Sequence, residues 1–222
     1  MGPNSIAILP AAEEKVRSND VDFPFRQDNN FWYLTGFNEP EAVMVLIPGR
    51  KQAEFILFNR EKDVTQERWH GKRLGQDGAT EELGADDAFP IEDIDDILPG
   101  LMEGRERIYF ALGANSEFDH KVMEWRSELM TSPAKRTDSP GELIDIGHHL
   151  HDMRLVKSQP EIQRMRYAAK ASAKAHIALM RACAPGKTER EMETELHYHF
   201  AKGGCRYPAY PSIIASGDNA NI

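Results

Sequence analysis

The sequence predicts an α/β domain followed by the beginning of a second domain that opens with two long helices. Short apolar runs alternate with helical patterns over the first 155 residues, and two amphipathic helices follow one another after that point. Strands interleaved with helices are typical of layered α/β domains. We therefore expect one domain over residues 1–155 and a second over residues 156–222.

Four runs in the first domain have the composition of strands. They are rich in Val, Ile and Phe and are bounded by Pro, Gly or charged residues, as strands of a buried sheet are. The four runs are residues 5–9, 42–47, 54–58 and 107–111.

Helical spacing follows in two segments of the first domain. In residues 91–102 isoleucines recur at helical spacing until Pro99 and Gly100, where we expect an interruption. Residues 117–130 carry a second apolar stripe that includes Val122 and Trp125. Residues 132–141 combine two prolines and a glycine with small polar residues and are predicted to be a linker.

The two helices of the second domain begin with capping boxes. Ser158 is followed by Glu161, and Thr188 by Glu191, which is the spacing at which the two side chains cap each other's backbone N–H groups. Residues 212–216 are predicted to form a strand. One strand and two striped helices need further sheet to cover them, so we expect the second domain to be incomplete within these 222 residues.

Composition and charge exclude several classes of protein. The apolar share of 41% and the charged share of 28% are those of a folded globular protein, and the net charge of −9 disfavours binding to nucleic acid. Cys183 and Cys205 lie in no CxxC pair, which predicts free thiols rather than a disulfide framework. No signal-peptide pattern or membrane-spanning run is present, so we expect no membrane association and a cytoplasmic location.

Two histidine groups are candidate metal ligands. His197 and His199 are two positions apart on a predicted helix and point in different directions, so they cannot hold one ion together. The cluster at residues 148–151 has no carboxylate partner at metal-ligand spacing, which favours a structural role. We therefore predict that no metal is held within this chain.

No catalytic residue is predicted within these 222 residues. The acidic run of Glu92, Asp93, Asp95 and Asp96 opposes a row of isoleucines and is interpreted as a solvated helix face. No nucleophile elbow, nucleotide-binding glycine motif or phosphate-binding loop is found.

Two aromatic stretches have an unusual polar setting. FPFRQDNNFWYLTGFNEP, residues 23–40, and RWHGKRL, residues 68–74, mix large rings with amides and basic side chains. Composition alone favours a core role for these rings, because aromatic side chains bury well against a sheet.

These stretches closely resemble a known family. PFRQDNNFWYLTGFNEPEAVMVL and LFNREKDVTQERWHGKRLGQDGA resemble the N-terminal domain of the bacterial aminopeptidase P (Xaa-Pro aminopeptidase) family. HDMRLVKSQPEIQRMRYAAKASAKAH and GGCRYPAYPSIIASGDNANI are similar to that family's entry into its catalytic domain. The resemblance covers nearly the whole chain.

The resemblance implies a fold and an activity. It implies a creatinase-like α/β domain followed by the start of a pita-bread metallopeptidase domain. Family members use two Mn²⁺ ions to hydrolyse the bond before proline in peptides with proline at the second position, and they assemble as homodimers or homotetramers. The matching positions place Trp69 and Asp20 at the border of a neighbouring subunit's substrate site, whereas the metal ligands would lie after residue 222.

Two alternatives stay open from the sequence. The chain could be a non-catalytic oligomerisation or binding module derived from the family, or part of a prolidase-like or creatinase-like hydrolase. If metal ligands lie outside these residues, we expect the chain by itself to be inactive as a peptidase.

Overall fold

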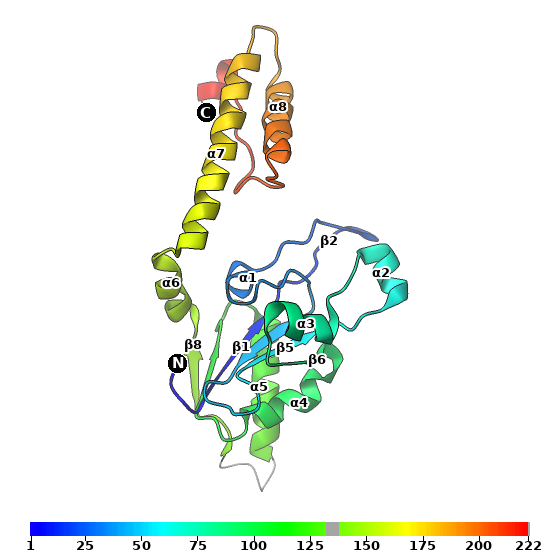
Figure 1. Ribbon diagram of the computed structural model, residues 1–222, viewed down its shortest axis with the longest axis vertical. Coiled ribbons are helices and arrows are strands. Elements are labelled where there is room, and N and C mark those ends of the chain that lie inside the picture. Colours follow the sequence, from blue (N-terminus) through cyan, green and yellow to red (C-terminus); the bar gives the residue numbers. More distant parts are fainter. Residues whose placement is uncertain (132–137, 222) are drawn as a thin grey trace. The chain divides into compact units, whose positions relative to one another are not determined.

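The computed structural model describes residues 1–131 and 138–221, and these form two compact units (Figure 1). The first unit is Met1–Met153 and the second is Arg154–Ile222. Most of the linker predicted at residues 132–141 lies outside the described residues.

A six-stranded mixed sheet forms the centre of the first unit. Its strands lie in the order β6-β5-β4-β1-β7-β8, with β1, β7 and β8 parallel to one another and β4 antiparallel to both of its neighbours. The strands are β1 (Ser5–Pro10), β4 (Val43–Leu46), β5 (Phe55–Asn59), β6 (Asp87–Pro90), β7 (Arg107–Phe110) and β8 (Glu142–Asp145). The four predicted strands are confirmed, and β6 and β8 add the two edges.

Alternation along each strand divides the core between the two faces of the sheet. In β1, Ile6 and Ile8 lie in one apolar cluster, whereas Ala7 and Leu9 lie in the other. Successive side chains of a strand point to opposite faces, so a strand buried on both sides reads as a continuous apolar run. This is why the four inner strands of the sheet were recognisable from their composition.

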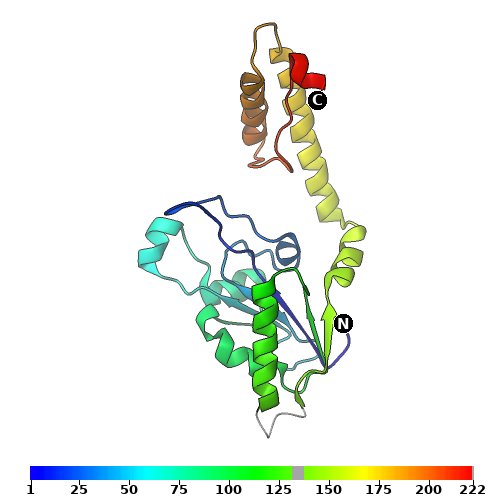
Figure 2. The same ribbon diagram turned by 180° about the vertical axis from the view of Figure 1, so that it is seen from behind.

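Helices cover both faces of the sheet. One face packs against α4 (Ile94–Met102) and α5 (Ser116–Thr131), and Figure 2 shows α5 in front of the sheet. The other face packs against α1 (Asn29–Thr35), α3 (Gly75–Leu83) and α6 (Gly147–Leu155). The resulting architecture is the layered α/β fold that the sequence predicted.

The expected interruption at Pro99 is wrong, because α4 continues through that residue to Met102. A short 3₁₀ turn at Ile91–Asp93 precedes the helix. Leu98 and Met102 are both fully buried in the core, and continuation of the helix is what places Met102 there. Packing therefore outweighs the hydrogen bond that proline cannot donate.

The second unit contains two packed helices, α7 (Gln159–Ala182) and α8 (Glu189–Lys202), and a tail that ends in the 3₁₀ turn Gly217–Asn221. At the start of α8 the Thr188 hydroxyl accepts from Glu191 N at 3.2 Å and Glu191 accepts from Thr188 N at 2.9 Å, which confirms that capping box. Ser158 and Glu161 form the capping box at α7, where the Ser158 N–H and hydroxyl both donate to Glu161 Oε2 at 2.7 Å.

The strand predicted at residues 212–216 is wrong, because no ladder forms there in the described chain. Ser212 and Ile214 are half-buried while Pro211 and Ile213 are exposed, so the alternation typical of a strand is present. A strand also needs a neighbour for its backbone groups, and the described residues of this unit supply none. None of the helices in the described chain combines the length and apolar character needed to cross a bilayer.

Candidate functional site

Trp69 lies near the end of a short exposed helix, α2 (Val64–His70), whose two ends have defined caps. Asp63 accepts hydrogen bonds from Thr65 N and Gln66 N at 2.7 and 3.1 Å. These bonds, that from Gln66 first, hold the pKa of Asp63 below its ordinary value. Gly71 ends the helix at φ 89°, a conformation that a residue with a Cβ adopts only under strain.

Helix α2 is not held by packing. None of its seven residues is buried, and the Trp69 and Val64 side chains are 83% and 70% exposed. A helix this short is unstable by itself in water, since nucleation costs more than a few hydrogen bonds return. Its position must therefore be set by the chain on either side of it.

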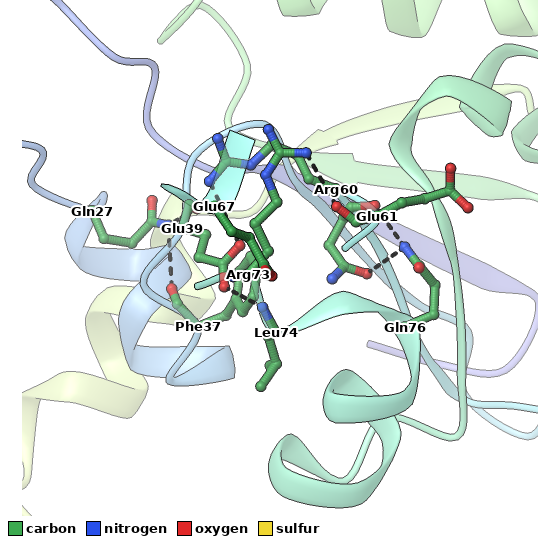
Figure 3. Close-up of polar contacts among 10 residues, drawn as sticks. Gln27, Phe37, Glu39, Arg60, Glu61, Glu67, Arg73, Leu74 and Gln76 are labelled. Atoms are coloured by element: carbon green, nitrogen blue, oxygen red, sulfur yellow. Dashed lines mark hydrogen bonds and ion pairs between the residues drawn. The ribbon is translucent and has the colours of Figure 1, made fainter. Parts of the chain in front are cut away.

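Residues 60–74, which include α2 and which we call the arm, contact the carboxylate of Glu39 at both of their ends (Figure 3). Glu39 Oε1 accepts a hydrogen bond from Leu74 N at 2.7 Å, at the end of the arm. Glu39 Oε2 lies 3.6 Å from Arg60 Nη2, at its beginning. One side chain thus contacts both ends of the arm.

Polar contacts within the arm fix its internal shape. Glu67 Oε1 accepts from Arg73 N at 2.9 Å, and Arg73 Nη1 donates to Glu61 O at 3.1 Å (Figure 3). These bonds close α2 and its following loop into a compact unit. Beyond the arm, Gln76 Nε2 donates to Asn59 O at 2.8 Å, which joins α3 to the end of β5.

Gln27 fixes the backbone on which Glu39 stands. Its side chain is buried, and its Nε2 donates to Phe37 O and Glu39 O at 3.2 and 2.9 Å. Its Oε1 accepts from Ala12 N and Asp28 N at 2.7 and 2.9 Å. All four hydrogen-bonding positions of the amide are used, so this side chain has a structural role.

Asp20 lies in the turn between β2 (Val16–Ser18) and β3 (Val21–Asp22), which form a two-stranded hairpin. The hairpin is exposed throughout, and Val16 and Val21 are 65% and 52% exposed. Figures 1 and 2 both show the hairpin and α2 projecting at the same end of the first unit. The two residues singled out by the resemblance therefore stand on separate exposed elements of one unit.

The histidines contact different partners. His197 Nε2 lies 2.7 Å from Ser212 Oγ, and His199 Nε2 lies 3.0 Å from Glu195 Oε1. His148 lies 3.5 Å from Asp152 on the exposed side of α6. Within residues 1–131 and 138–221, no three His, Cys, Asp or Glu side chains come together in a way that could hold a metal ion.

Glu189 binds the tail of the second unit. Its Oε1 accepts from Ser216 N at 2.8 Å and from Asn219 Nδ2 at 3.0 Å. These bonds, that from Asn219 first, hold the pKa of Glu189 below its ordinary value. The tail, α7 and α8 also enclose a groove of about 460 Å³ whose lining includes His176, Phe200 and Ile213.

Sequence reasoning did not identify Gln27, Glu39 or Glu189 as important residues. The partners of Glu39 at Arg60 and Leu74 are 21 and 35 positions away, and no local pattern links them. The one available signal was that Gln27 and Glu39 both lie within the polar aromatic stretch at residues 23–40.

Two family models match this chain. Residues 1–109 match the aminopeptidase P N-terminal domain, and residues 163–222 match metallopeptidase family M24. The matches fall on the first and second units respectively.

Curated relatives match over the whole chain. The Xaa-Pro aminopeptidase of Escherichia coli is 42% identical over all of this chain and 51% of its own length, and that of Haemophilus influenzae is 36% identical over all of this chain and 49% of its own length. The chain thus spans about half the length of the curated relatives it matches.

Solved structures are similar to this chain in both fold and sequence. Pseudomonas aeruginosa aminopeptidase PepP superposes with a TM-score of 0.96 at 56% identity, covering 99% of this chain and 50% of that one. A zinc-substituted Escherichia coli aminopeptidase P in complex with product superposes with a TM-score of 0.95 at 42% identity, covering 100% of this chain and 51% of that one. The two domain models match in this order, and fold and sequence agree over the whole chain. This chain therefore belongs to the aminopeptidase P family of M24 metallopeptidases.

Proposed function

We propose that these 222 residues serve a Xaa-Pro aminopeptidase, which releases the residue that precedes proline at the N-terminus of a peptide. The observation that carries the proposal is the 56% identity to Pseudomonas aeruginosa aminopeptidase PepP, maintained over 99% of this chain together with the fold. Fold alone would not assign an activity, because one fold supports many chemistries. Here the similarity extends across both units, and the named relatives are Xaa-Pro aminopeptidases.

The metal chemistry is assigned to residues outside this chain. A pair of divalent ions, manganese as the resemblance implies, would supply a nucleophile and polarise the scissile carbonyl. The described residues do not fit such a centre, because their histidines and carboxylates form no group of three that could hold an ion. We therefore attribute no step of hydrolysis to any residue named here.

The part proposed for the first unit is to complete a substrate site in an oligomer. Trp69 and Asp20 are the residues that the resemblance places at this border, and we propose them in that role. Support comes from exposure: Trp69 is 83% exposed although large aromatic rings are normally buried. Assembly as a homodimer or homotetramer and a cytoplasmic location belong to the same proposal.

A chimaera tests the function directly. Residues 1–222 are joined to the remaining half of Pseudomonas aeruginosa aminopeptidase PepP, and release of the first residue is measured with Mn²⁺ on a peptide with proline at the second position. We expect turnover on this peptide and at least tenfold less on the same peptide with alanine there. A folded chimaera that cleaves neither peptide, or cleaves both equally, would contradict the assignment.

The 222-residue chain itself is the matched control. Because its described residues provide no metal-holding group, we expect no turnover above buffer with Mn²⁺. Turnover that copurifies with this chain through successive separations and survives the removal of contaminating peptidases would refute this expectation. Comparing dipeptides with longer peptides in the chimaera separates an aminopeptidase from a prolidase-like enzyme.

A second candidate function is a non-catalytic assembly module. It is favoured by one observation, the exposure of apolar side chains on α2 and on the β2–β3 hairpin, since exposed apolar surface commonly marks an interface. The coding sequence that follows Ile222 discriminates between the two candidates. Metal ligands encoded there favour the enzyme, and a natural stop codon favours the module.

A further inference from the structure

The position of the arm, residues 60–74, depends on polar contacts at its base. Its helix α2 has no buried residue, so apolar packing does not hold it against the sheet. At the base of the arm, Leu74 packs against the core, and one hydrogen bond and one ion pair join the arm to Glu39. Losing one of these contacts should therefore move or loosen the arm and leave the core intact.

Glu39 makes contacts at both ends of the arm. Its Oε1 receives the Leu74 N–H at 2.7 Å, and its Oε2 faces Arg60 Nη2 at 3.6 Å (Figure 3). Bringing two points of a chain together costs conformational entropy, and contacts that hold the closed form must offset it. A single carboxylate that binds both ends keeps the arm closed at its base.

This ion pair is largely shielded from solvent, so losing it should cost more stability than losing a pair on the surface. The side chains of Arg60 and Glu39 are 11% and 18% exposed, and among the described residues neither Arg60 Nε nor Glu39 Oε2 has a hydrogen-bond partner. Removing the carboxylate would leave a mostly buried guanidinium without a counter-charge and the Leu74 N–H without its acceptor. Both losses are costly in a partly desolvated place, unlike the loss of an exposed pair.

The carboxylate itself stands on a fixed backbone. Gln27 Nε2 donates to Glu39 O at 2.9 Å, and the oxygen of the same amide accepts from Ala12 N, two residues after β1 ends. Gln27 thus fixes Glu39 relative to the chain that follows β1, and Glu39 in turn fixes the base of the arm.

We propose that Glu39 is the positioning residue of the arm: its carboxylate sets where Trp69 stands relative to the first unit. The proposed function is needed only to explain why the position of Trp69 matters, namely that Trp69 borders a substrate site. The positioning itself is a property of this chain and can be measured without any activity.

Hydrogen exchange in the 222-residue chain tests the positioning. In Glu39→Ala we expect exchange at the Leu74 amide and across residues 64–74 to rise at least tenfold, with exchange in β1 and β4 unchanged. Glu39→Gln keeps an acceptor for Leu74 N, so it should restore protection at that amide while exchange elsewhere in the arm stays raised.

Glu61→Ala is the matched control. It removes the same charge from the arm itself, but the contact of Glu61 with Arg73 uses the Glu61 backbone oxygen, which the substitution retains. Equal exchange in Glu39→Ala and Glu61→Ala would overturn the proposal. A uniform rise that includes β1 and β4 would also overturn it, because it would indicate general destabilisation.

The chimaera tests whether the position of Trp69 matters for activity. In the chimaera, Glu39→Ala and Trp69→Ala should each change KM or kcat in the same direction, and the double variant should show no larger change than Trp69→Ala. Full additivity of the two effects would overturn the link to Trp69. An inactive wild-type chimaera would instead refute the proposed function, and the exchange measurement would still decide the positioning.

Discussion

At the scale of residues, single carboxylates that belong to exposed runs make specific contacts. The acidic run at residues 92–96 is exposed, as predicted, but Asp95 also accepts from Trp125 Nε1 at 2.8 Å and lies 3.1 Å from Lys121 Nζ. It therefore joins α4 to α5. A helical pattern predicts which face is polar, but the partner of each polar residue comes from a second helix some 30 positions away.

Asp95 gives the chain a defined acid sensitivity. The Trp125 hydrogen bond, followed by Lys121, holds the pKa of Asp95 below its ordinary value of 3.8. The resulting stabilisation is complete above the ordinary value and is lost as the pH falls through the lower folded-state pKa. We expect Asp95→Asn to lower the urea midpoint, followed by tryptophan fluorescence, at about pH 7 and much less near pH 2.5.

Asp96→Asn is the control for this measurement. It removes the same charge one position along the same exposed face. Its midpoint should stay close to that of the unsubstituted chain at both pH values. If Asp95→Asn lowers the urea midpoint as much in acid as at neutral pH, the stabilisation does not come from the ionised carboxylate.

At the scale of elements, the sequence predicted structures whose signals are local. Capping boxes and apolar stripes located α7 and α8, and apolar runs located four strands, because these signals lie within a few residues of each other. Helix α2 was missed because it has no buried stripe to reveal it. The edge strand β6 was missed because its composition, DAFP, becomes a strand only beside β5.

Two threonines of α8 should respond oppositely to the same substitution. Thr188→Ala removes the cap of the Glu191 N–H and should cost about 1 kcal/mol of helix stability. Thr194 is exposed within the helix, so Thr194→Ala should stabilise it by a few tenths of a kcal/mol, roughly the difference in helix propensity. Hydrogen exchange of the α8 amides measures both, and equal effects of one sign would contradict the capping assignment.

At the scale of the whole molecule, the two units differ in how much core each contains. Both apolar clusters of the sheet lie within residues 6–150, whereas the buried apolar residues in the described part of the second unit are Ala171, Ala175, Met192 and Leu196. Four such side chains remove little apolar surface from water, so they contribute little to folding. The predicted division into domains near residue 155 thus separates a unit rich in core from one poor in it.

A shortened chain of residues 1–155 should fold by itself. We expect a single cooperative thermal transition by circular dichroism, since the whole sheet and both of its clusters are retained. A separate peptide of residues 156–222 should show partial helicity without a cooperative transition. Cooperative unfolding of that peptide, or failure of residues 1–155 to fold, would contradict this account.

The sequence therefore predicted the class of fold and the family, but not the contacts that place the exposed arm. Strands and caps depend on neighbours in the chain, whereas the position of Trp69 depends on Glu39, thirty positions earlier.

The side chains of residues 211–214 alternate between exposed and half-buried, yet no strand of the described chain pairs with this segment. Ile213 is 86% exposed. An unpaired backbone of this kind acts as a template: the first strand laid beside it inherits its direction and register. Any sheet assembled on this unit would take its alignment from that one segment, and errors of a single position there would turn every later side chain to the wrong face.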